Sequence, residues 1–350
     1  MNPHTNCNKT RTKNAIGVGV NVLGIETSCD ETSVSVVRNG REVLSNAVSS
    51  SERFHKIYGG IVPEIASRMQ LEAITAVSDL AIKESAIMLK DIDLISVTSG
   101  PGLFGSLLIG VSFAKALSAG LHIPLLGVNH VHSHIYANFL NGGGVKLPFV
   151  ALVVSGGHTS LFYVKDFDKI EILGETQDDA CGEAFDKVAK ILGLGYPGGP
   201  HIEKISLRGN PEKIKFRCSD TKGAFNFSFS GIKTGVLYYL RDTGYGIRYP
   251  LPLVKDIAAS FQETAIDVLI RKSFLACKTK KLNRLVVGGG VAANDRMRER
   301  FYEAGKDAGF KCWFPAKEHC MDNAAMVAGL GYQLFKKGKI SGLDLSVESN

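Results

Sequence analysis

The sequence predicts an α/β protein built from two similar halves. Short apolar runs rich in β-branched residues alternate along the 350-residue chain with longer segments of helical periodicity, which is the pattern of layered α/β folds. Both halves also open on the same plan of strand, tight polar turn and strand. Hydrophobic residues make up 45% of the chain and charged residues 21%, so the composition excludes disordered and fibrous proteins.

The individual elements are expected where these patterns are clearest. Side chains of a strand alternate between two faces, whereas those of a helix return to one face every three or four positions, as Phe261, Ala265 and Val268 do. The expected strands are Val22–Thr27, Ser33–Val37, Leu94–Ser99, Pro148–Val154, Thr159–Val164 and Arg284–Val287. The expected helices are Glu64–Leu89, Gly105–Ala119, Ala180–Leu192, Ile257–Cys277 and Asn294–Ala308, with a last helix after Asp322.

Three turns rich in glycine or hydroxyl residues follow expected strands. The segments Val22–Val36 and Val150–Val164 each read as a hairpin with a small polar turn, and Val286–Asn294 reads as a strand that enters a glycine turn and then a helix. Such turns present backbone N–H groups to phosphate, and the N-terminus of a helix favours anions. The glycine run at residues 141–144 is the clearest linker and separates the two halves.

The sequence favours a soluble protein of a reducing compartment, with the cytoplasm expected. The best membrane-span candidate, Leu107–Val128, is interrupted by charged and helix-breaking residues. Seven scattered cysteines without a Cys-x-x-Cys pair argue against a disulfide framework and a zinc ribbon. The first 20 residues carry basic but no acidic side chains and lack an apolar signal core. A flexible extension over residues 1–21 is therefore expected, with a mitochondrial or plastid presequence as the alternative.

The net charge of +7 is concentrated in the second half of the chain. Residues 1–200 hold 16 Lys and Arg against 19 Asp and Glu, whereas residues 201–350 hold 25 against 15. This asymmetry is typical of a surface that faces a polyanion such as nucleic acid, and solvated helix faces are the alternative interpretation. The candidate basic surface comprises Lys213, Lys215, Arg217, Lys222 and Lys233.

The order of the three turns resembles that in the two-lobed superfamily of actin, the heat-shock ATPases, sugar kinases and acetate kinase. Ten motifs narrow the resemblance to one family, the TsaD-type tRNA threonylcarbamoyladenosine transferases, once called O-sialoglycoprotein endopeptidases. They span the chain from Val22 to the helix after Asp322. The motifs are Gly24–Thr32, Tyr58–Arg68, Ser99–Leu103, Asn129–His134, Val154–His158, Gly182–Lys187, Tyr196–Pro200, Phe229–Thr234, Gly288–Asn294 and Met321–Ala325.

The resemblance implies a two-lobed actin-like (ASKHA) fold in which each lobe holds a mixed sheet flanked by helices. Residues 22–140 would form lobe I, residues 141–320 would form lobe II, and residues 321–350 would return to lobe I. Two positions depart from the family pattern. Gln70 stands where the family usually has a histidine, and His132 adds an imidazole inside the histidine pair.

His130 and His134 predict a metal site, because side chains four residues apart share one face of a helix. The resemblance adds Asp322 as the third ligand, although an aspartate before an apolar helix is also a typical N-cap. Two histidines and one carboxylate suit a divalent metal, Fe(II) first and Zn(II) second. Val131 stands where a zinc protease of the His-Glu-x-x-His type needs its glutamate, so proteolysis by that mechanism is unsupported.

The resemblance also implies a site for an acyl-adenylate. Small residues let backbone amides reach the phosphate, Asp186 would contact the sugar, and Asn294 would close the adenine end. An ion pair from Asp186 to Lys190 and a helix N-cap at Asn294 are the alternatives. The predicted binding residues are Val153, Val154, Ser155, Gly156, Gly157, His158, Asp186, Gly199, Glu203 and Asn294. Three acids of the first turn, Glu26, Asp30 and Glu31, are expected to arrange the acyl group or the second substrate.

The function implied by the resemblance is transfer of threonylcarbamoyl from threonylcarbamoyl-AMP to N6 of the adenosine immediately 3′ of the anticodon, with release of AMP. The affected tRNAs would be those that read codons beginning with adenine. No Ser-His-Asp or Cys-His arrangement stands out in the motifs, so direct transfer is expected and no residue is assigned as catalytic. A small-molecule kinase of the same superfamily and a non-catalytic scaffold are the alternative hypotheses.

The expected partners follow from the same resemblance. Bacterial relatives work with a degenerate paralogue, TsaB, and a P-loop ATPase, TsaE, so that Mg-ATP enters through partner proteins. A separate enzyme makes the adenylate. Organellar relatives act instead as homodimers. The substrates expected to bind this chain are tRNA and threonylcarbamoyl-AMP, and no membrane is expected to take part.

Overall fold

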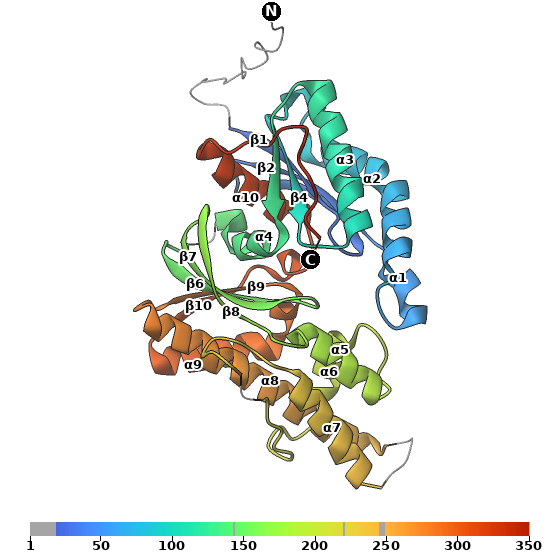
Figure 1. Ribbon diagram of the computed structural model, residues 1–350, viewed down its shortest axis with the longest axis vertical. Coiled ribbons are helices and arrows are strands. Elements are labelled where there is room, and N and C mark those ends of the chain that lie inside the picture. The colour runs from blue at the N-terminus through green and yellow to red at the C-terminus, as the bar shows by residue number, and fades with distance from the viewer. Residues whose placement is uncertain (1–18, 143, 220, 245–248, 350) are drawn as a thin grey trace, which may run out of the picture.

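A computed structural model describes residues 19–142, 144–219, 221–244 and 249–349 (Figure 1). Of the N-terminal extension expected over residues 1–21, residues 1–18 lie outside the described residues. Asn21 already belongs to the first strand. Two five-stranded sheets, each flanked by helices, form the framework of the molecule.

Sheet A belongs to lobe I and has the strand order β3-β2-β1-β4-β5. Strand β2 is antiparallel to both of its neighbours, β1 and β3, whereas β1, β4 and β5 run parallel to one another. The strands are β1 (Asn21–Glu26), β2 (Glu31–Arg38), β3 (Glu42–Ser50), β4 (Leu94–Gly100) and β5 (Leu125–Asn129).

Sheet B belongs to lobe II and repeats this plan with the order β10-β9-β6-β7-β8. Strands β6, β7 and β8 are antiparallel neighbours, and β6, β9 and β10 run parallel. The strands are β6 (Phe149–Val154), β7 (Thr159–Asp166), β8 (Lys169–Glu175), β9 (Arg284–Gly288) and β10 (Lys311–Trp313). The predicted likeness of the two halves is therefore confirmed at the level of strand order and direction.

The helices form three layers around the two sheets (Figure 1). Helices α2 and α3 pack on the outer face of sheet A, α4 and α10 lie between the sheets, and α5 to α9 pack beyond sheet B. The helices are α1 (Glu52–His55), α2 (Pro63–Ser85), α3 (Phe104–Leu121), α4 (His130–Tyr136), α5 (Cys181–Ile191), α6 (Gly198–Ser206), α7 (Ser230–Asp242), α8 (Leu251–Thr279), α9 (Asp295–Ala308) and α10 (Ala324–Lys336).

The strands that the sequence analysis did not predict all lie at sheet edges. They are β3, β5, β8 and β10, and β3 and β8 show little of the burial that makes a strand apolar. Helices α6 and α7 were also not predicted. Helix α2 ends four residues earlier than expected, because Ala86 adopts a left-handed conformation with φ of 54°.

Helix α3 is long and apolar enough to cross a membrane by length and composition alone. In the fold, however, Leu107, Val111 and Ala114 are buried, and the last two pack in the core of lobe I beside β1 and β4. The apolar composition of α3 is thus accounted for by its packing against sheet A.

The chain beyond α10 covers the edge strand β5. Ser341 donates its backbone N–H to Leu125 O at 2.7 Å, and Leu345 packs over Gly127. Further on, Glu348 donates its N–H to Ser99 O at 2.8 Å. A covered edge is protected from pairing with strands of other chains.

Asp178 holds the N-terminal end of α7. Its Oδ2 accepts hydrogen bonds from the hydroxyls of Ser228 (2.5 Å) and Ser230 (2.7 Å), and its Oδ1 accepts those from the N–H groups of Phe229 (2.8 Å) and Ser230 (3.2 Å). Burial alone would raise the pKa of Asp178, but these hydrogen bonds outweigh it and lower the pKa below its usual value.

Asp178→Ala is expected to lower the free energy of unfolding by about 2 kcal/mol, because a helix cap and the partner of the buried Ser228 hydroxyl are lost. Because the pKa is lowered in the folded state, the stabilisation is present above the unfolded pKa of about 3.9 and is lost as the pH falls through the folded pKa. Urea unfolding at pH 7 measures the effect. The control is Asp242→Ala, an exposed acid at the other end of α7. Equal midpoints for the two variants would contradict the prediction.

Candidate metal and nucleotide site between the lobes

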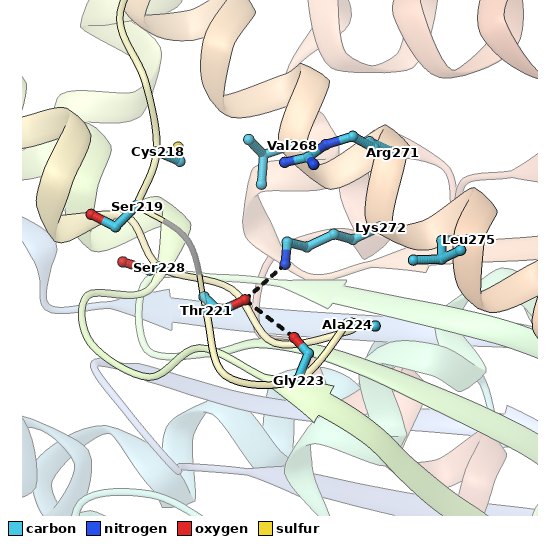
Figure 2. A pocket seen from close by; sticks show the side chains of 10 residues that line it. All are labelled: Cys218, Ser219, Thr221, Gly223, Ala224, Ser228, Val268, Arg271, Lys272 and Leu275. Atoms are coloured by element: carbon cyan, nitrogen blue, oxygen red, sulfur yellow. Dashed lines mark hydrogen bonds between the residues drawn. The ribbon is translucent and has the colours of Figure 1, made fainter.

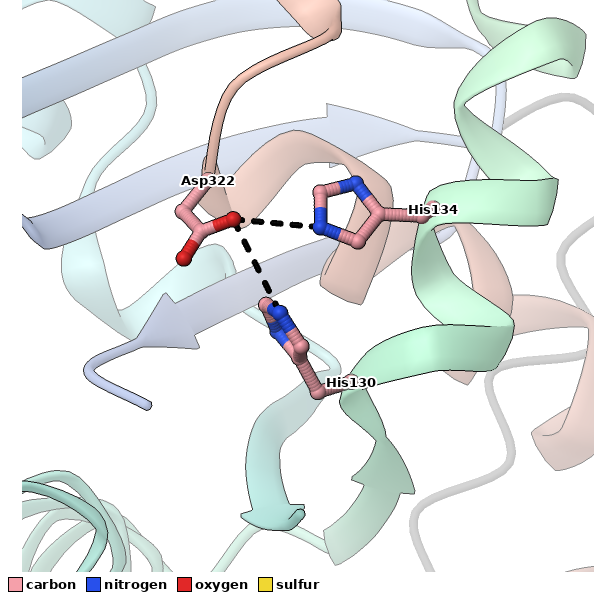
Figure 3. Close-up of side chains that lie close together, drawn as sticks. All are labelled: His130, His134 and Asp322. Carbon is pink, nitrogen blue, oxygen red and sulfur yellow. Dashed lines mark ion pairs between the residues drawn. The ribbon is translucent and has the colours of Figure 1, made fainter. Parts of the chain in front are cut away.

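Helix α4 and the segment before α10 bring His130, His134 and Asp322 together (Figure 3). One ligand atom from each of the three lies within 4.8 Å of the others. Asp322 Oδ1 is 3.1 Å from His134 Nε2 and 3.7 Å from His130 Nε2, and the two imidazole centroids are 4.7 Å apart. The predicted ligand set is therefore assembled in space from two parts of the chain that lie almost 190 residues apart.

Local structure explains why these three side chains are available. Asn129 caps α4 by accepting the N–H of His132, so that His130 and His134 occupy the same face of one short helix. Asn323 caps α10 by accepting the N–H of Met326 at 3.1 Å. The alternative interpretation of Asp322 as the helix N-cap is therefore wrong, and its carboxylate points toward α4.

Glu26, at the end of β1, fixes the orientation of His130. The fully buried Glu26 places Oε2 at 3.0 Å from His130 Nδ1 and accepts the hydroxyl of Thr98 at 2.7 Å. Its Oε1 accepts the N–H of Ser28 at 2.6 Å. These contacts turn His130 Nε2 toward Asp322. Sequence reasoning expected Glu26 to arrange an acyl group or substrate, but the structure places it behind a histidine.

The electrostatics of the cluster fit a cation. Burial lowers the pKa of His130, but Asp322 and Glu26 outweigh burial and raise it to about 9. Burial raises the pKa of Asp322, but His130 and His134 hold it well below its usual range. Among the described residues, His134 Nδ1 has no hydrogen-bond partner and Nε2 has only the Asp322 carboxylate at 3.1 Å, although buried polar atoms normally find good partners. A metal ion bound by Nε2 would satisfy this imidazole.

The turn between β6 and β7 leaves two amides free. Ser155 donates its N–H to His158 O at 2.8 Å, and His158 donates its N–H to Ser155 Oγ at 3.0 Å. These bonds use the amides of Ser155 and His158, which the predicted phosphate cradle had included. Among the described residues, the N–H groups of the exposed Gly156 and Gly157 have no hydrogen-bond partner. These two N–H groups are therefore the ones in this turn that can still bind an anion.

Gly288, the last residue of β9, and Gly289 after it allow close approach to α4 and to the end of β6, respectively. A Cβ on Gly288 would lie 2.4 Å from His134 O, and one on Gly289, with φ of +92°, would lie 2.4 Å from Val154 O. Both approaches require glycine. Val153 and Val154 themselves are buried in β6, so they support the turn from the core.

The residues predicted for the sugar and adenine ends gather around α6. Asp186 Oδ1 accepts the N–H of Gly198 at 2.6 Å, beside Gly199, and no ion pair joins Asp186 to Lys190 among the described residues. Burial raises the pKa of Asp186. Glu203 accepts the N–H of Asp295 at 2.6 Å, which links α6 to the start of α9.

Asn294 is the N-cap of α9, which the sequence analysis had given as the alternative to a role at the adenine end. Its Oδ1 accepts the N–H of Met297 at 2.8 Å, and its amide donates to Gln262 Oε1 at 3.0 Å. Glu203 binds Asp295, the next residue of the same turn, so Asn294 lies close to Glu203.

The two departures from the family pattern have separate structural roles. Gln70 is fully buried, and its Nε2 donates to the carbonyls of Cys29 (2.9 Å) and Glu31 (3.0 Å), which anchors the β1–β2 turn. His132 packs edge-on against Phe162, and burial lowers its pKa to about 4. It stays neutral and lies outside the metal cluster.

The last predicted groups to place are the acid Glu31 of the first turn and the five residues of the candidate basic surface. Burial, with Asp322 and Asp30 nearby, raises the pKa of Glu31 well above its usual value. Lys233 is paired with Asp179 at 2.8 Å, so it is a poorer candidate for the basic surface than predicted. The other four members, Lys213, Lys215, Arg217 and Lys222, are exposed.

The two matched sheets and the site between them define the class of the molecule, which is the ASKHA fold. The HypF protein of T. kodakarensis superposes with a TM-score of 0.63 at 13% identity, covering 92% of this chain and 50% of that one. Component A of the (R)-2-hydroxyglutaryl-CoA dehydratase from Acidaminococcus fermentans gives 0.53 at 14% identity, covering 91% and 100%. At these identities the likeness concerns the fold alone.

Sequence comparison identifies the particular family. The TsaD family model, described as tRNA N6-adenosine threonylcarbamoyltransferase, matches residues 42–329. Proteins of that name from Thermodesulfovibrio yellowstonii and Clostridium kluyveri are 52% and 49% identical over 329 and 332 residues. Each alignment covers 94% of this chain, and 98% and 96% of the respective relative. The chain belongs to the TsaD family, which confirms the transferase hypothesis over the kinase and scaffold alternatives.

Proposed function

We propose that this chain transfers the threonylcarbamoyl group of threonylcarbamoyl-AMP to N6 of the adenosine immediately 3′ of the anticodon. The observation that carries the proposal is the short distance between the β6–β7 turn and the cluster of His130, His134 and Asp322. The ring of His158, in the phosphate turn, has its centroid 6.4 Å from that of His130 in the metal cluster. A donor whose phosphate binds at the turn would thus present its acyl end to the cluster.

His130, His134 and Asp322 would hold one divalent metal, Fe(II) first and Zn(II) second, with Glu26 fixing His130 from behind. When bound, the metal supplies Lewis-acid polarisation and a template for the acyl group. The donor set supports this assignment, because it combines two imidazoles with one carboxylate, and within the described part of the chain the nitrogens of His134 have no partner besides Asp322.

The chain's own groups would bind the donor and orient it. The amides of Gly156 and Gly157 and the hydroxyl of Ser155 would receive the phosphate oxygens, while Asp186 and Asn294 would lie toward the nucleoside. His158 would take part as a neutral imidazole, because burial and the nearby His130 lower its pKa to about 4.

The transfer would need no acylated protein group. Burial and the neighbouring acids, Asp322 first among them, raise the pKa of Cys29 well above its usual value, so this cysteine stays a thiol. The N6 amine would attack the carbamoyl carbonyl of the mixed anhydride. The bond from that carbon to the phosphate oxygen would break, AMP would leave, and the amine would lose one proton.

The proposal is tested by single-turnover transfer with the purified chain. Threonylcarbamoyl-AMP and unmodified tRNA would be supplied, with and without TsaB- and TsaE-type helpers and Mg-ATP. The expected products are equal amounts of AMP and threonylcarbamoyl-adenosine, measured by mass spectrometry of the tRNA nucleosides. The matched control is a tRNA that carries guanosine in place of the adenosine immediately 3′ of the anticodon. No modified nucleoside under any helper combination, with the donor shown to be intact, would overturn the proposal.

A further inference from the structure

The segment that carries Asp322 crosses from lobe II to lobe I. It leaves β10 at Trp313, forms a turn over residues 314–320 and then leads through Asp322 to the start of α10. On the lobe I side, the N–H of Ala324 donates to Ser33 Oγ of β2 at 2.9 Å. On the lobe II side, the position of Asp322 depends on what holds the turn before it.

Arg298 of α9 binds this turn at both of its ends. Its Nη2 donates to Pro315 O at 2.7 Å and to Cys320 Sγ at 3.1 Å. Cys320 is fully buried and stands two residues before Asp322. The guanidinium carbon of Arg298 also lies 5.2 Å from the centroid of the Phe314 ring. Hydrogen bonds from a charged donor are stronger than neutral ones, and a planar guanidinium serves several acceptors at fixed angles.

The same guanidinium is anchored in the core of lobe II. Its Nε donates to the carbonyl of Ala292 at 2.7 Å. Ala292 is fully buried in the turn after β9, which begins at Gly289, and Gly289 approaches Val154 O too closely to carry a side chain. Val154 is the last residue of β6, from which the β6–β7 turn starts. Arg298 therefore relates the position of Asp322 to that of the β6–β7 turn.

Other side chains contribute less to holding the turn before Asp322. Lys317 pairs with Asp295 at 2.6 Å, but both side chains are exposed, and exposed ion pairs contribute little. His319 is buried, and among the described residues neither of its ring nitrogens has a hydrogen-bond partner. Within the described part of the chain, Arg298 is therefore the main side-chain link between this turn and lobe II.

We propose that Arg298 is a positioning residue of the metal site, because it holds Asp322 where its carboxylate meets His130 and His134. The inference rests on the proposed function, since it takes these three residues as the metal ligands, and it extends that site to a residue of α9. Without Arg298, the segment that carries Asp322 would be held mainly from the lobe I side. Arg298 itself would contribute no metal ligand.

The test uses Arg298→Met and Arg298→Lys in the full chain, with Zn(II) alone as the probe. Methionine keeps an unbranched apolar side chain beside Phe314 but removes all three hydrogen bonds, whereas lysine keeps the charge without the fork of donors. Chelator competition would give the metal Kd. We expect the Kd to rise about tenfold for Arg298→Met, and by a smaller, measurable factor for Arg298→Lys, because residues that orient metal ligands are typically worth about 10- to 100-fold in affinity. At saturating metal, kcat for transfer should return close to the wild-type value.

Two controls separate positioning from a general loss of stability. Lys317→Ala removes the exposed ion pair between the same turn and α9, and should leave the metal Kd unchanged. Thr221→Val acts elsewhere in lobe II, in the cavity between α8 and the chain that precedes α7 (Figure 2). There Thr221 Oγ1 accepts a hydrogen bond from Lys272 Nζ at 3.0 Å and donates one to Gly223 O at 3.2 Å. This variant should lower the melting temperature without changing the metal Kd.

The outcomes distinguish this inference from the proposed function. If the wild type binds Zn(II) and Asp322→Ala does not, an unchanged Kd in the Arg298 variants would overturn the inference alone, and Arg298→Lys decides should Arg298→Met not fold. A rise of equal size in either control would reduce the role of Arg298 to stability and also overturn it. Equal binding by the wild type and Asp322→Ala would refute the metal site and the inference together. Zn(II) affinities in the expected order without any transfer would support the role of Arg298 and refute the proposed reaction.

Discussion

Asp322→Ala is expected to reduce threonylcarbamoyl transfer by more than about 100-fold and to abolish stoichiometric metal binding. Its carboxylate contributes one of three donors, 3.1 Å from His134 Nε2, and alanine leaves two imidazoles without the charge that balances a divalent ion. Loss of a residue that only orients a metal ligand costs about 10- to 100-fold, and loss of a direct ligand should cost more. Elemental analysis after dialysis against Fe(II) or Zn(II), followed by single-turnover transfer, measures both effects.

The control for Asp322→Ala is Glu318→Ala, which removes an exposed acid four residues earlier. That variant should retain metal and activity. Because Asn323, and not Asp322, caps α10, Asp322→Ala should unfold in urea at a midpoint close to that of the control. A variant that keeps full metal content and normal transfer would remove Asp322 from the ligand set.

Glu26→Gln is expected to weaken metal affinity by about 10- to 100-fold through His130. The Glu26 carboxylate is approached by the Ser28 N–H, the Thr98 hydroxyl and His130 Nδ1, so an amide would set its own N–H group against one of these donors. It would also remove the buried charge that helps raise the pKa of His130. Glu26 is thus a positioning residue, and its effect should appear first in the metal Kd.

The Glu26 prediction is checked by chelator competition, which reports metal Kd independently of transfer. Thr98→Val is the graded control, since it removes one hydrogen bond to Glu26 while keeping the carboxylate, and its loss of affinity should be smaller. At saturating metal, Glu26→Gln should recover much of the wild-type transfer rate. An unchanged metal Kd with lowered stability would show that Glu26 only supports the fold.

The sequence predicts the centre of this fold better than its edges. Strands such as β1 and β6 are buried on both faces and read as continuous apolar runs. The strand β3 is exposed at both ends and mixes polar with apolar residues, so its pairing with β2 depends on the neighbouring strand more than on its own pattern.

The candidate site shows the same division. The spacing of His130 and His134 predicts a shared helix face, whereas Asp322 came from the family resemblance because no local pattern joins it to them. The role of Glu26 was missed, since it depends on the end of β1 lying beside the start of α4. The identity of the α10 cap as Asn323 likewise required coordinates.

The position of α10 has a consequence for the order in which the molecule is made. Sheet A is complete by residue 129, but the helix that packs against its inner face comes from Ala324–Lys336. A ribosome delivers the N-terminal part first, so lobe I emerges with an apolar face uncovered while all of lobe II is still being synthesised. Such a nascent chain presents a long-lived surface for chaperones. A message truncated before Asp322 would yield a protein that lacks both this cover and the third donor of the cluster.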